Sequence, residues 1–260
     1  MVATRSDDWL VADWPAPRAV RSLLTTRSGG VSRAPYASFN LGDHVGDDPL
    51  AVAINRRSLD THLPASPLWL QQVHGTDVVE AHGVGAMGAP LADAALTRSP
   101  GVVCGVLTAD CLPLLLCDRA GSVVAAAHAG WRGLLAGIVQ TTVRAMAVDG
   151  SDLLAYLGPA IGPQAFVVGD DVRSAFVDSA ARAAAAFRPL APPSQANGQT
   201  DVHSWLADIY LLARQALAEV GVETVFGGEY CTVGDARRFF SYRRDGVTGR
   251  MASLIWLTTD

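Results

Sequence analysis

The chain has 260 residues, 50% of them hydrophobic, and a mean hydropathy of +0.23, which is enough apolar material for a large core. A formal net charge of −5 and a pI near 5.6 exclude the basic field of a typical nucleic-acid-binding protein. The amino-terminal MVATRSDDWL carries Asp7 and Asp8 where a signal peptide would be apolar, and Asp110 and Pro113 interrupt the most hydrophobic stretch. Four cysteines without a CxxC pair predict free thiols in a reducing compartment. We therefore expect a cytoplasmic protein without a membrane partner.

Short apolar runs alternate with helical stretches along the chain, which is typical of an α/β protein. Several runs are rich in Val and Leu on both faces, as buried strands are. In chain order we predict a strand at 21–26, a helix at 49–59, strands at 68–73, 102–108, 112–117 and 123–128, a helix at 131–146, a strand at 155–157, helices at 171–186 and 202–220, and a strand at 253–257. Proline and small polar residues predict an exposed loop near 188–200 within one domain over 1–260.

Three potential metal ligands lie at the ends of predicted strands. His74 closes LWLQQVHG, Cys111 follows GVLTAD, and His128 closes SVVAAAHAG. Two nitrogens and one sulfur would leave a fourth tetrahedral position open, as catalytic zinc sites do. Each residue alone is equally typical of a protein core, because a free cysteine packs as a small hydrophobe. The three together predict a Zn²⁺ site if the strand ends meet.

Two aspartates lie in apolar surroundings, where an ionised carboxylate is costly unless it is paired or hydrogen-bonded. Asp110 directly precedes Cys111, so we expect it to orient a ligand or a substrate hydroxyl, or to act as a base. The alternative role for Asp110 is to accept backbone amides at a bulge. Asp93, in LADAALT, raises the same question with less sequence context.

Arginines beside glycine turns and aromatic residues are candidates for anion binding. Arg27 lies in TTRSGGVS, and Arg132 lies in HAGWRGLLAGIV, where exposed amides at a helix start would attract an anion. The segment RRFFSYRRDGVTGR, at 237–250, interleaves arginines with aromatic residues and could contact phosphate or stack on a base. Such a charge cluster is also typical of a solvated surface, and in an acidic protein it does not predict nucleic-acid binding.

These segments resemble the laccase-domain family, also called the multifunctional purine nucleoside phosphorylase family, which includes peptidoglycan editing factor. The matching segments run in the family's order over nearly the whole chain: TTRSGGVS, SFNLGDHVGDD, QQVHGTDVV, DAALT, TADCLPLLLCD, AAAHAGWRG, YLGPAIGP and FFSYRRDGVTGR. The resemblance implies a single-domain α/β/β/α sandwich with mixed sheets and Zn²⁺ bound by His74, Cys111 and His128. It also implies phosphorolysis of adenosine, inosine and methylthioadenosine, and deamination of adenosine.

The expected site residues follow from this resemblance and from the patterns above. We expect His74, Cys111, His128 and Asp110 to be catalytic. We expect purine nucleosides and phosphate to be bound by Arg27, Asn40, Arg132 and Arg243; the oligomeric state stays open. After GPAIGP the family commonly has CFEVG, whereas this chain has QAFVVGDD with Ala165 and Val167. Neither Ala165 nor Val167 is among the expected metal ligands. The resemblance therefore supports the metal site more strongly than it supports a particular substrate.

Other functions account for fewer of these residues. A multicopper oxidase needs more imidazoles than six histidines provide, and no methionine is spaced from Cys111 like the axial ligand of a blue-copper centre. A metal-free Cys-His hydrolase, or a hydrolase that edits a peptidoglycan precursor, would use Cys111 as nucleophile and one histidine as base. Such a dyad leaves the other histidine unexplained. A non-catalytic partner of cell-division proteins gives no reason for Cys and His at strand ends.

Overall fold

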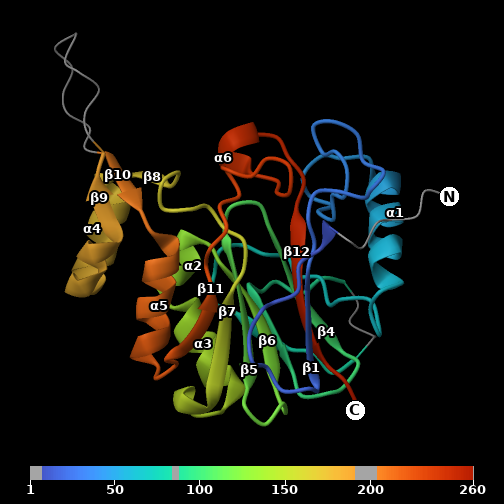
Figure 1. Cartoon of the computed structure of the whole chain (residues 1–260), viewed down its shortest axis with the longest axis horizontal. Coiled ribbons are helices and arrows are strands. Elements are labelled where there is room, and N and C mark those ends of the chain that lie inside the picture. The colour runs from blue at the N-terminus through green and yellow to red at the C-terminus, as the bar shows by residue number, and fades with distance from the viewer. Residues whose placement is uncertain (1–7, 84–87, 191–203, 260) are drawn as a thin grey trace.

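The computed structural model describes residues 8–83, 88–190 and 204–259, and this part of the chain forms three β-sheets (Figure 1). The largest is a mixed six-stranded sheet in the order β11-β7-β5-β6-β3-β2. Its strands are β2 (Val78–Glu80), β3 (Ala94–Thr97), β5 (Leu112–Asp118), β6 (Val124–Ala129), β7 (Leu153–Leu157) and β11 (Thr224–Gly227). The second sheet is antiparallel and contains β1 (Val20–Leu24), β12 (Met251–Leu257) and β4 (Val103–Thr108).

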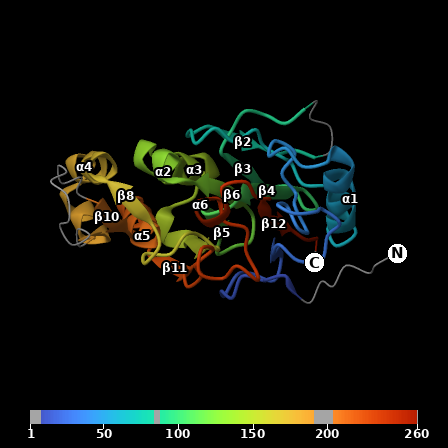
Figure 2. The ribbon, with the colours of Figure 1, turned by 90° about the horizontal axis from the view of Figure 1, so that it is seen from above.

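The two larger sheets pack face to face between layers of helices. Successive side chains of a strand point to opposite faces, so Leu114 and Leu116 of β5 pack toward helices while Leu115 and Cys117 pack against the second sheet. Helices α2 (Trp131–Ala136), α3 (Ile138–Met146) and α5 (Ile209–Glu219) cover the outer face of the six-stranded sheet. Helix α1 (Pro49–Asp60) covers the outer face of the second sheet (Figure 2). This arrangement confirms the α/β/β/α sandwich with mixed sheets.

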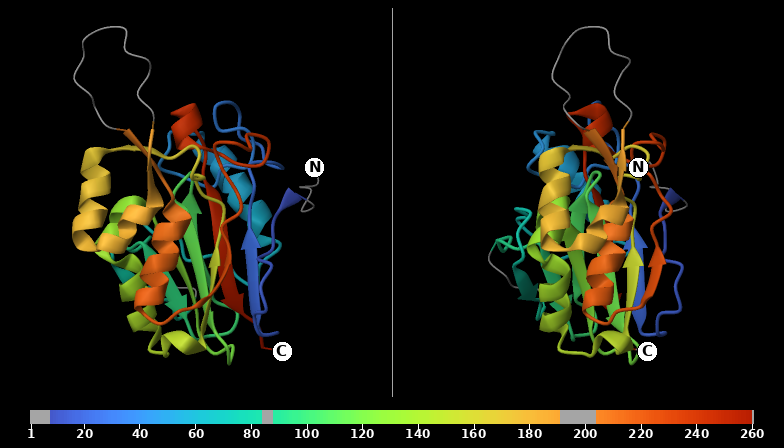
Figure 3. Two further views of the ribbon diagram at one scale, coloured as in Figure 1. Left: turned by 60° about the vertical axis from the view of Figure 1, so that its left-hand side comes forward. Right: turned by 90° about the vertical axis from the view of Figure 1, so that its left-hand side faces the viewer.

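A small third sheet lies at one end of the molecule, beside helix α4 (Asp170–Ser179), as Figure 3 shows. It contains β8 (Val167–Gly169), β10 (Ser204–Ala207) and β9 (Phe187–Pro189), all antiparallel. The predicted helix over 202–220 was therefore wrong at its start, because β10 precedes α5 and Asp208 caps that helix by accepting from Leu211 N–H. The predicted loop near 188–200 was wrong at its first residues, which belong to β9, and residues 191–200 lie outside the described ranges.

Three other predicted elements differ from the structure. The helix predicted over 131–146 is two helices, because Gly137 adopts a left-handed conformation with φ 100° and ends α2. The helix predicted over 171–186 is α4 followed by a 3-10 helix at Ala181–Ala186. The segment 68–73 is not a strand and makes only isolated bridges at Leu68 and Gln71. In its place, β2 and β3 extend the six-stranded sheet.

The structure bears on the predicted state of the cysteines and on membrane-spanning helices. All four cysteines are free thiols, as predicted. Among the described residues, no helix is long and apolar enough to cross a membrane.

Candidate metal centre and its cavity

The structure brings His74, Cys111 and His128 together at one end of the six-stranded sheet. Cys111 lies in the connection between β4 and β5, His128 lies in the neighbouring strand β6, and His74 lies in a turn with φ 60°. One potential ligand atom from each residue lies within 4.8 Å of the others. Cys111 Sγ is 3.6 Å from His74 Nε2, and the two imidazole rings meet edge to face with centroids 4.7 Å apart. These residues form a group that could hold a metal ion.

Asp93 supports two members of this group from immediately before β3. Its carboxylate accepts a hydrogen bond from His128 Nδ1 at 2.8 Å and from the backbone N–H groups of Val73, His74 and Gly75. Burial alone would raise the pKa of Asp93, but the hydrogen bonds from His128 and from the amides of Gly75 and Val73 hold it below its usual value. An ionised carboxylate at this point directs the other nitrogen of His128, Nε2, toward Cys111.

The charges at the site suit a metal that prefers sulfur and nitrogen ligands. Burial favours the neutral thiol, yet His128 and His74 outweigh it and lower the pKa of Cys111 to about 6. Burial lowers the pKa of His128, but Cys111 and Asp93 raise it. The buried Cys104, by contrast, has its pKa raised to about 12 because desolvation acts alone. A thiolate with two imidazoles fits tetrahedral Zn²⁺ and leaves one position for another ligand.

Gly130 borders the group and leaves room for it. A Cβ atom at this position would lie 2.6 Å from His74 Cδ2 and 3.1 Å from Cys111 Sγ, both closer than ordinary contacts. The glycine after the β6 strand is therefore needed for space beside the candidate ligands, and not for an unusual backbone angle, since its φ is −60°.

A cavity of about 600 Å³ opens over these residues. Its lining combines the three potential ligands with cationic, aromatic and apolar side chains. Besides His74, Cys111 and His128, it is lined by His44, Gln72, Leu107, Thr108, Ala109, Asp110, Trp131, Arg132, Ile161, Phe166, Ile209, Tyr242, Arg243 and Arg250. Such a mixture can hold a ligand that has both a flat apolar part and an anionic part.

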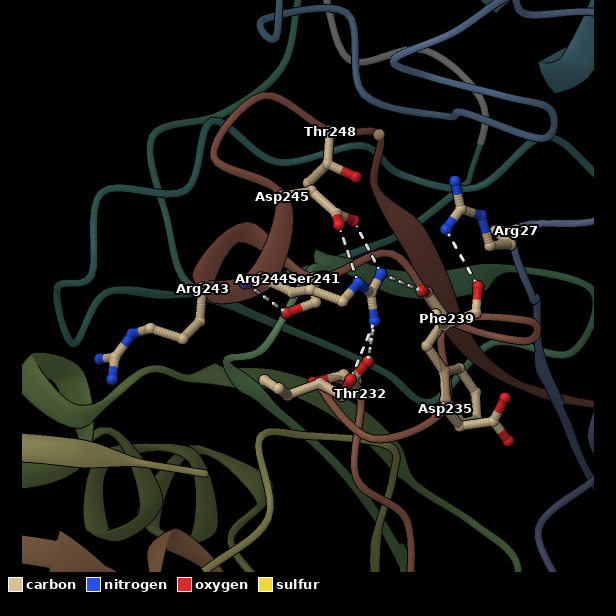
Figure 4. Close-up of polar contacts among 12 residues, drawn as sticks. Arg27, Thr232, Asp235, Phe239, Ser241, Arg243, Arg244, Asp245 and Thr248 are labelled. Atoms are coloured by element: carbon tan, nitrogen blue, oxygen red, sulfur yellow. Dashed lines mark hydrogen bonds and ion pairs between the residues drawn. The ribbon is translucent and has the colours of Figure 1, made fainter. Parts of the chain in front are cut away.

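Two of the predicted substrate-binding arginines line this cavity. Arg132 lies over the ring of Trp131, with 4.4 Å between the guanidinium carbon and the ring centroid. Arg243 belongs to the short helix α6 (Tyr242–Asp245) and donates to Val167 O at 2.8 Å. Figure 4 shows the Arg243 side chain turned away from Arg244, which instead donates to carbonyl oxygens of Thr232 and Phe239 and to Asp245. Within the arginine-rich segment, Arg243 therefore lines the cavity, whereas Arg244 binds neighbouring backbone carbonyls and Asp245.

The other two predicted substrate-binding residues do not line the cavity. Arg27 lies against Phe240 and donates to Ala37 O and Ala236 O, so its side chain joins two loops. Asn40 is fully buried, and its side-chain oxygen accepts from the backbone N–H of Arg250 at 2.8 Å. Arg250 does line the cavity. The structure thus gives Arg27 and Asn40 supporting positions, and it does not place either side chain where we expected it.

Asp110 lines the cavity but is tied to the carboxyl-terminal segment. One carboxylate oxygen accepts from the Thr232 hydroxyl at 2.5 Å, and the other accepts from the backbone N–H of Arg243 at 2.6 Å. Its φ of 96° lies in a region that residues with a Cβ rarely adopt. Asp110 therefore holds the segment that carries Tyr242 and Arg243 beside the potential metal ligands.

Sequence reasoning missed several cavity residues. Arg250 and Tyr242 belong to the arginine-rich segment that was considered for phosphate or base contact, but neither was among the expected substrate-binding residues. Trp131 was visible within HAGWRG as an aromatic residue at a turn. His44 and Gln72 carried no sequence signal beyond their position inside the family-like segments.

Fold and site together define a mixed α/β protein with a His-Cys-His group that could bind a metal at the floor of a cavity. The family model described as multi-copper polyphenol oxidoreductase laccase matches residues 21–258, and the chain belongs to this family. This finding confirms the resemblance seen in the sequence segments.

Named relatives cover almost the whole chain. A Pseudomonas aeruginosa protein named purine nucleoside phosphorylase is 55% identical over 249 residues, which are 96% of this chain and 98% of that protein. Purine nucleoside phosphorylase YfiH of Escherichia coli is 52% identical over 95% of this chain and 98% of its own length. A crystal structure of a Neisseria meningitidis protein, 52% identical, has a TM-score of 0.88 over 96% of this chain and 99% of that chain. YlmD from Geobacillus stearothermophilus, 34% identical, has a TM-score of 0.81 over 96% of each chain.

Proposed function

We propose that this protein is a cytoplasmic, zinc-dependent purine nucleoside phosphorylase that takes adenosine, inosine and methylthioadenosine, and that it also deaminates adenosine. The observation that carries the proposal is the His74, Cys111 and His128 group beside an arginine-bearing cavity. The names of relatives that are 55% and 52% identical support the same reaction class.

The chain's own residues supply the binding functions that phosphorolysis needs. The cavity volume lies within the ~300–1,000 Å³ of ordinary small-molecule sites. Trp131, Phe166 and Tyr242 offer aromatic surfaces to a purine. Arg132 and Arg243 offer guanidinium groups that can bind a phosphate in a bidentate fashion. These groups would hold the nucleoside and phosphate in one orientation, which lowers the entropic cost of the reaction.

His74, Cys111 and His128 would hold Zn²⁺, which when bound supplies a Lewis acid with an open position. Deamination also needs a group that moves a proton. Asp110 is the only carboxylate among the described residues that line the cavity, so we assign this step to it. Each Asp110 oxygen already accepts one hydrogen bond and keeps a second lone pair for a substrate proton.

The test combines metal analysis with product analysis. Protein purified without chelator should contain close to one zinc per chain, and Cys111→Ala should remove it. With phosphate, adenosine should yield adenine and ribose 1-phosphate; without phosphate, inosine should be the product. Cys231→Ala is a matched control, because Cys231 is also a partly buried free thiol but is not part of the group. Full activity in metal-free protein would overturn the proposal.

A second candidate function has one specific observation in its favour. Cys111, His128 and Asp93 lie in series, in the order nucleophile, base and orienting carboxylate that thiol hydrolases use. Such an enzyme would cleave an acyl bond, including one in a peptidoglycan precursor, through a covalent bond to Cys111 Sγ. Rapid quenching followed by mass spectrometry distinguishes the two functions: an adduct on Cys111 in active, zinc-free protein would favour the hydrolase.

A further inference from the structure

We propose that Asp93 is the positioning residue for both histidine ligands, so that one carboxylate fixes the backbone of His74 and the ring of His128. The inference rests on the proposed metal site and goes beyond it, since Asp93 itself is buried too deeply to reach a metal or substrate: its exposed fraction is 0% and it does not line the cavity.

Asp93 holds the turn that carries His74 through its backbone. Three successive backbone N–H groups, those of Val73, His74 and Gly75, donate to the Asp93 carboxylate at 3.1, 2.9 and 2.7 Å. Consecutive amides that converge in this way form a nest for an anion. His74 has φ 60°, a left-handed conformation that is unfavourable for a residue with a Cβ atom. The carboxylate stabilises this conformation and so aims the His74 ring at Cys111.

Asp93 also fixes which ring nitrogen of His128 faces the candidate metal site. Asp93 Oδ1 accepts from His128 Nδ1 at 2.8 Å, and the backbone N–H of His128 donates to Asp93 O at 2.7 Å. A carboxylate with no proton can only accept, so the imidazole must carry its proton on Nδ1. In the neutral ring the lone pair therefore lies on Nε2, where it can bind a metal, and the ring cannot rotate without breaking the hydrogen bond to Asp93.

The geometry demands a carboxylate and not merely a polar side chain. Oδ1 accepts from His74 N–H and His128 Nδ1, while Oδ2 accepts from Val73 N–H and Gly75 N–H. An asparagine has one accepting oxygen and one donating nitrogen. In one orientation its NH₂ group would face two amide donors. In the other it would donate to His128 Nδ1, which would move the ring proton to Nε2 and block the ligand atom.

The experiment is a cobalt titration of Asp93→Asn beside the wild-type protein and Asp118→Asn. Asp118 is a matched control because it is also a buried carboxylate that accepts two backbone amides, from Ser122 and Val123, and the Ser122 hydroxyl, but it is not part of the His-Cys-His group. We expect Asp93→Asn to weaken Co²⁺ binding, measured by chelator competition, by about 10- to 100-fold, as for other residues that support metal ligands. Its visible Co²⁺ absorption should also change, whereas Asp118→Asn should match the wild type in both.

The outcomes separate this inference from the metal proposal. A wild-type protein that binds neither Co²⁺ nor Zn²⁺ would overturn the metal site itself. Normal metal binding in the wild type with an unchanged affinity and spectrum in Asp93→Asn would overturn only the role of Asp93.

A measurement on the wild type covers the case in which Asp93→Asn does not fold. In the proton NMR spectrum of the Co²⁺-loaded protein, the Nδ1–H of His128 should give a shifted signal that exchanges slowly with solvent, because it is buried and bound to Asp93. Exchange as fast as that of an exposed imidazole, or ligation through Nδ1, would refute the inference.

Discussion

The smallest substitution that should disrupt the metal site is Gly130→Ala. The backbone of Gly130, with φ −60° and ψ 155°, is one that alanine adopts without strain. The added Cβ, however, would lie 2.6 Å from His74 Cδ2, where carbon atoms prefer ~3.5–4.0 Å, so the ring must move by roughly 1 Å. His74 Nε2 moves with the ring, and a metal site tolerates only about 0.2 Å in its ligand distances. We expect zinc affinity to fall at least about 100-fold, the upper end for indirect perturbations of metal sites.

The same substitution should leave the metal-free fold almost intact, because an imidazole ring at a cavity wall can shift without moving the backbone. Replacing glycine stabilises by ~0.4–1 kcal/mol through the unfolded chain, which offsets part of the cost of the ring shift. Chelator competition measures zinc affinity, and urea unfolding with chelator present measures the metal-free stability. Gly234→Ala is the control, because its Cβ would meet Cys231 Sγ at an ordinary 3.6 Å. Wild-type zinc affinity in Gly130→Ala, or a metal-free stability several kcal/mol lower, would refute this reasoning.

Three further predictions concern the thiol, the arginines and the carboxylate of the cavity. In metal-free protein at pH 7, iodoacetamide should alkylate Cys111, whose pKa is about 6, and spare Cys104, whose pKa is about 12; mass spectrometry should show the Cys111 rate falling as the pH drops through 6. Arg132→Lys and Arg243→Lys should each raise the phosphate concentration needed for phosphorolysis about tenfold, since lysine keeps the charge but loses the fork; steady-state kinetics that show no change in either would place the anion elsewhere. Asp110→Asn should abolish most deamination while the zinc content stays normal. It should also lower the free energy of unfolding by about 1–3 kcal/mol, because one of the donors from Thr232 and Arg243 loses its charged acceptor. An unchanged rate of inosine formation would argue against a role of Asp110 in proton transfer.

The central strands could be predicted because each is a continuous run of mostly apolar residues, which is typical of a strand buried on both faces. The predicted strands 102–108, 112–117 and 123–128 agree with β4, β5 and β6 to within one residue at every end, since each is buried along its whole length. The edge strand β2 and the strands of the small third sheet have only three or four residues, which is too few for the alternation of apolar and polar side chains to be recognised. The apolar run 68–73 looked like a strand, but it pairs only at isolated bridges, because tertiary context decides which apolar segments join a sheet.

The potential metal ligands could be predicted where they lie at the ends of predicted strands. Cys111 directly precedes β5, and His128 lies near the end of the antiparallel neighbour β6, so their approach follows from the hairpin that joins β5 and β6. Arg27 could not be separated from Arg243 on sequence, because both are arginines close to a glycine-containing turn. Both side chains donate to distant backbone carbonyls, and what distinguishes them is where those carbonyls lie: Val167 O holds Arg243 at the cavity, whereas Ala37 O and Ala236 O hold Arg27 away from it.

Asp93 shows why a supporting residue is harder to find than a ligand. A metal ligand is recognised by its chemical type, because Cys and His are uncommon and bind metals directly. A supporting carboxylate is recognised only by what donates to it, and here the donors are the amides at 73–75 and the ring at 128, about 20 and 35 residues away on opposite sides in the chain. None of those backbone amides has a sequence signature. The buried charge in LADAALT was the one available signal, and its physical meaning follows only when four donors are seen to converge on two oxygens.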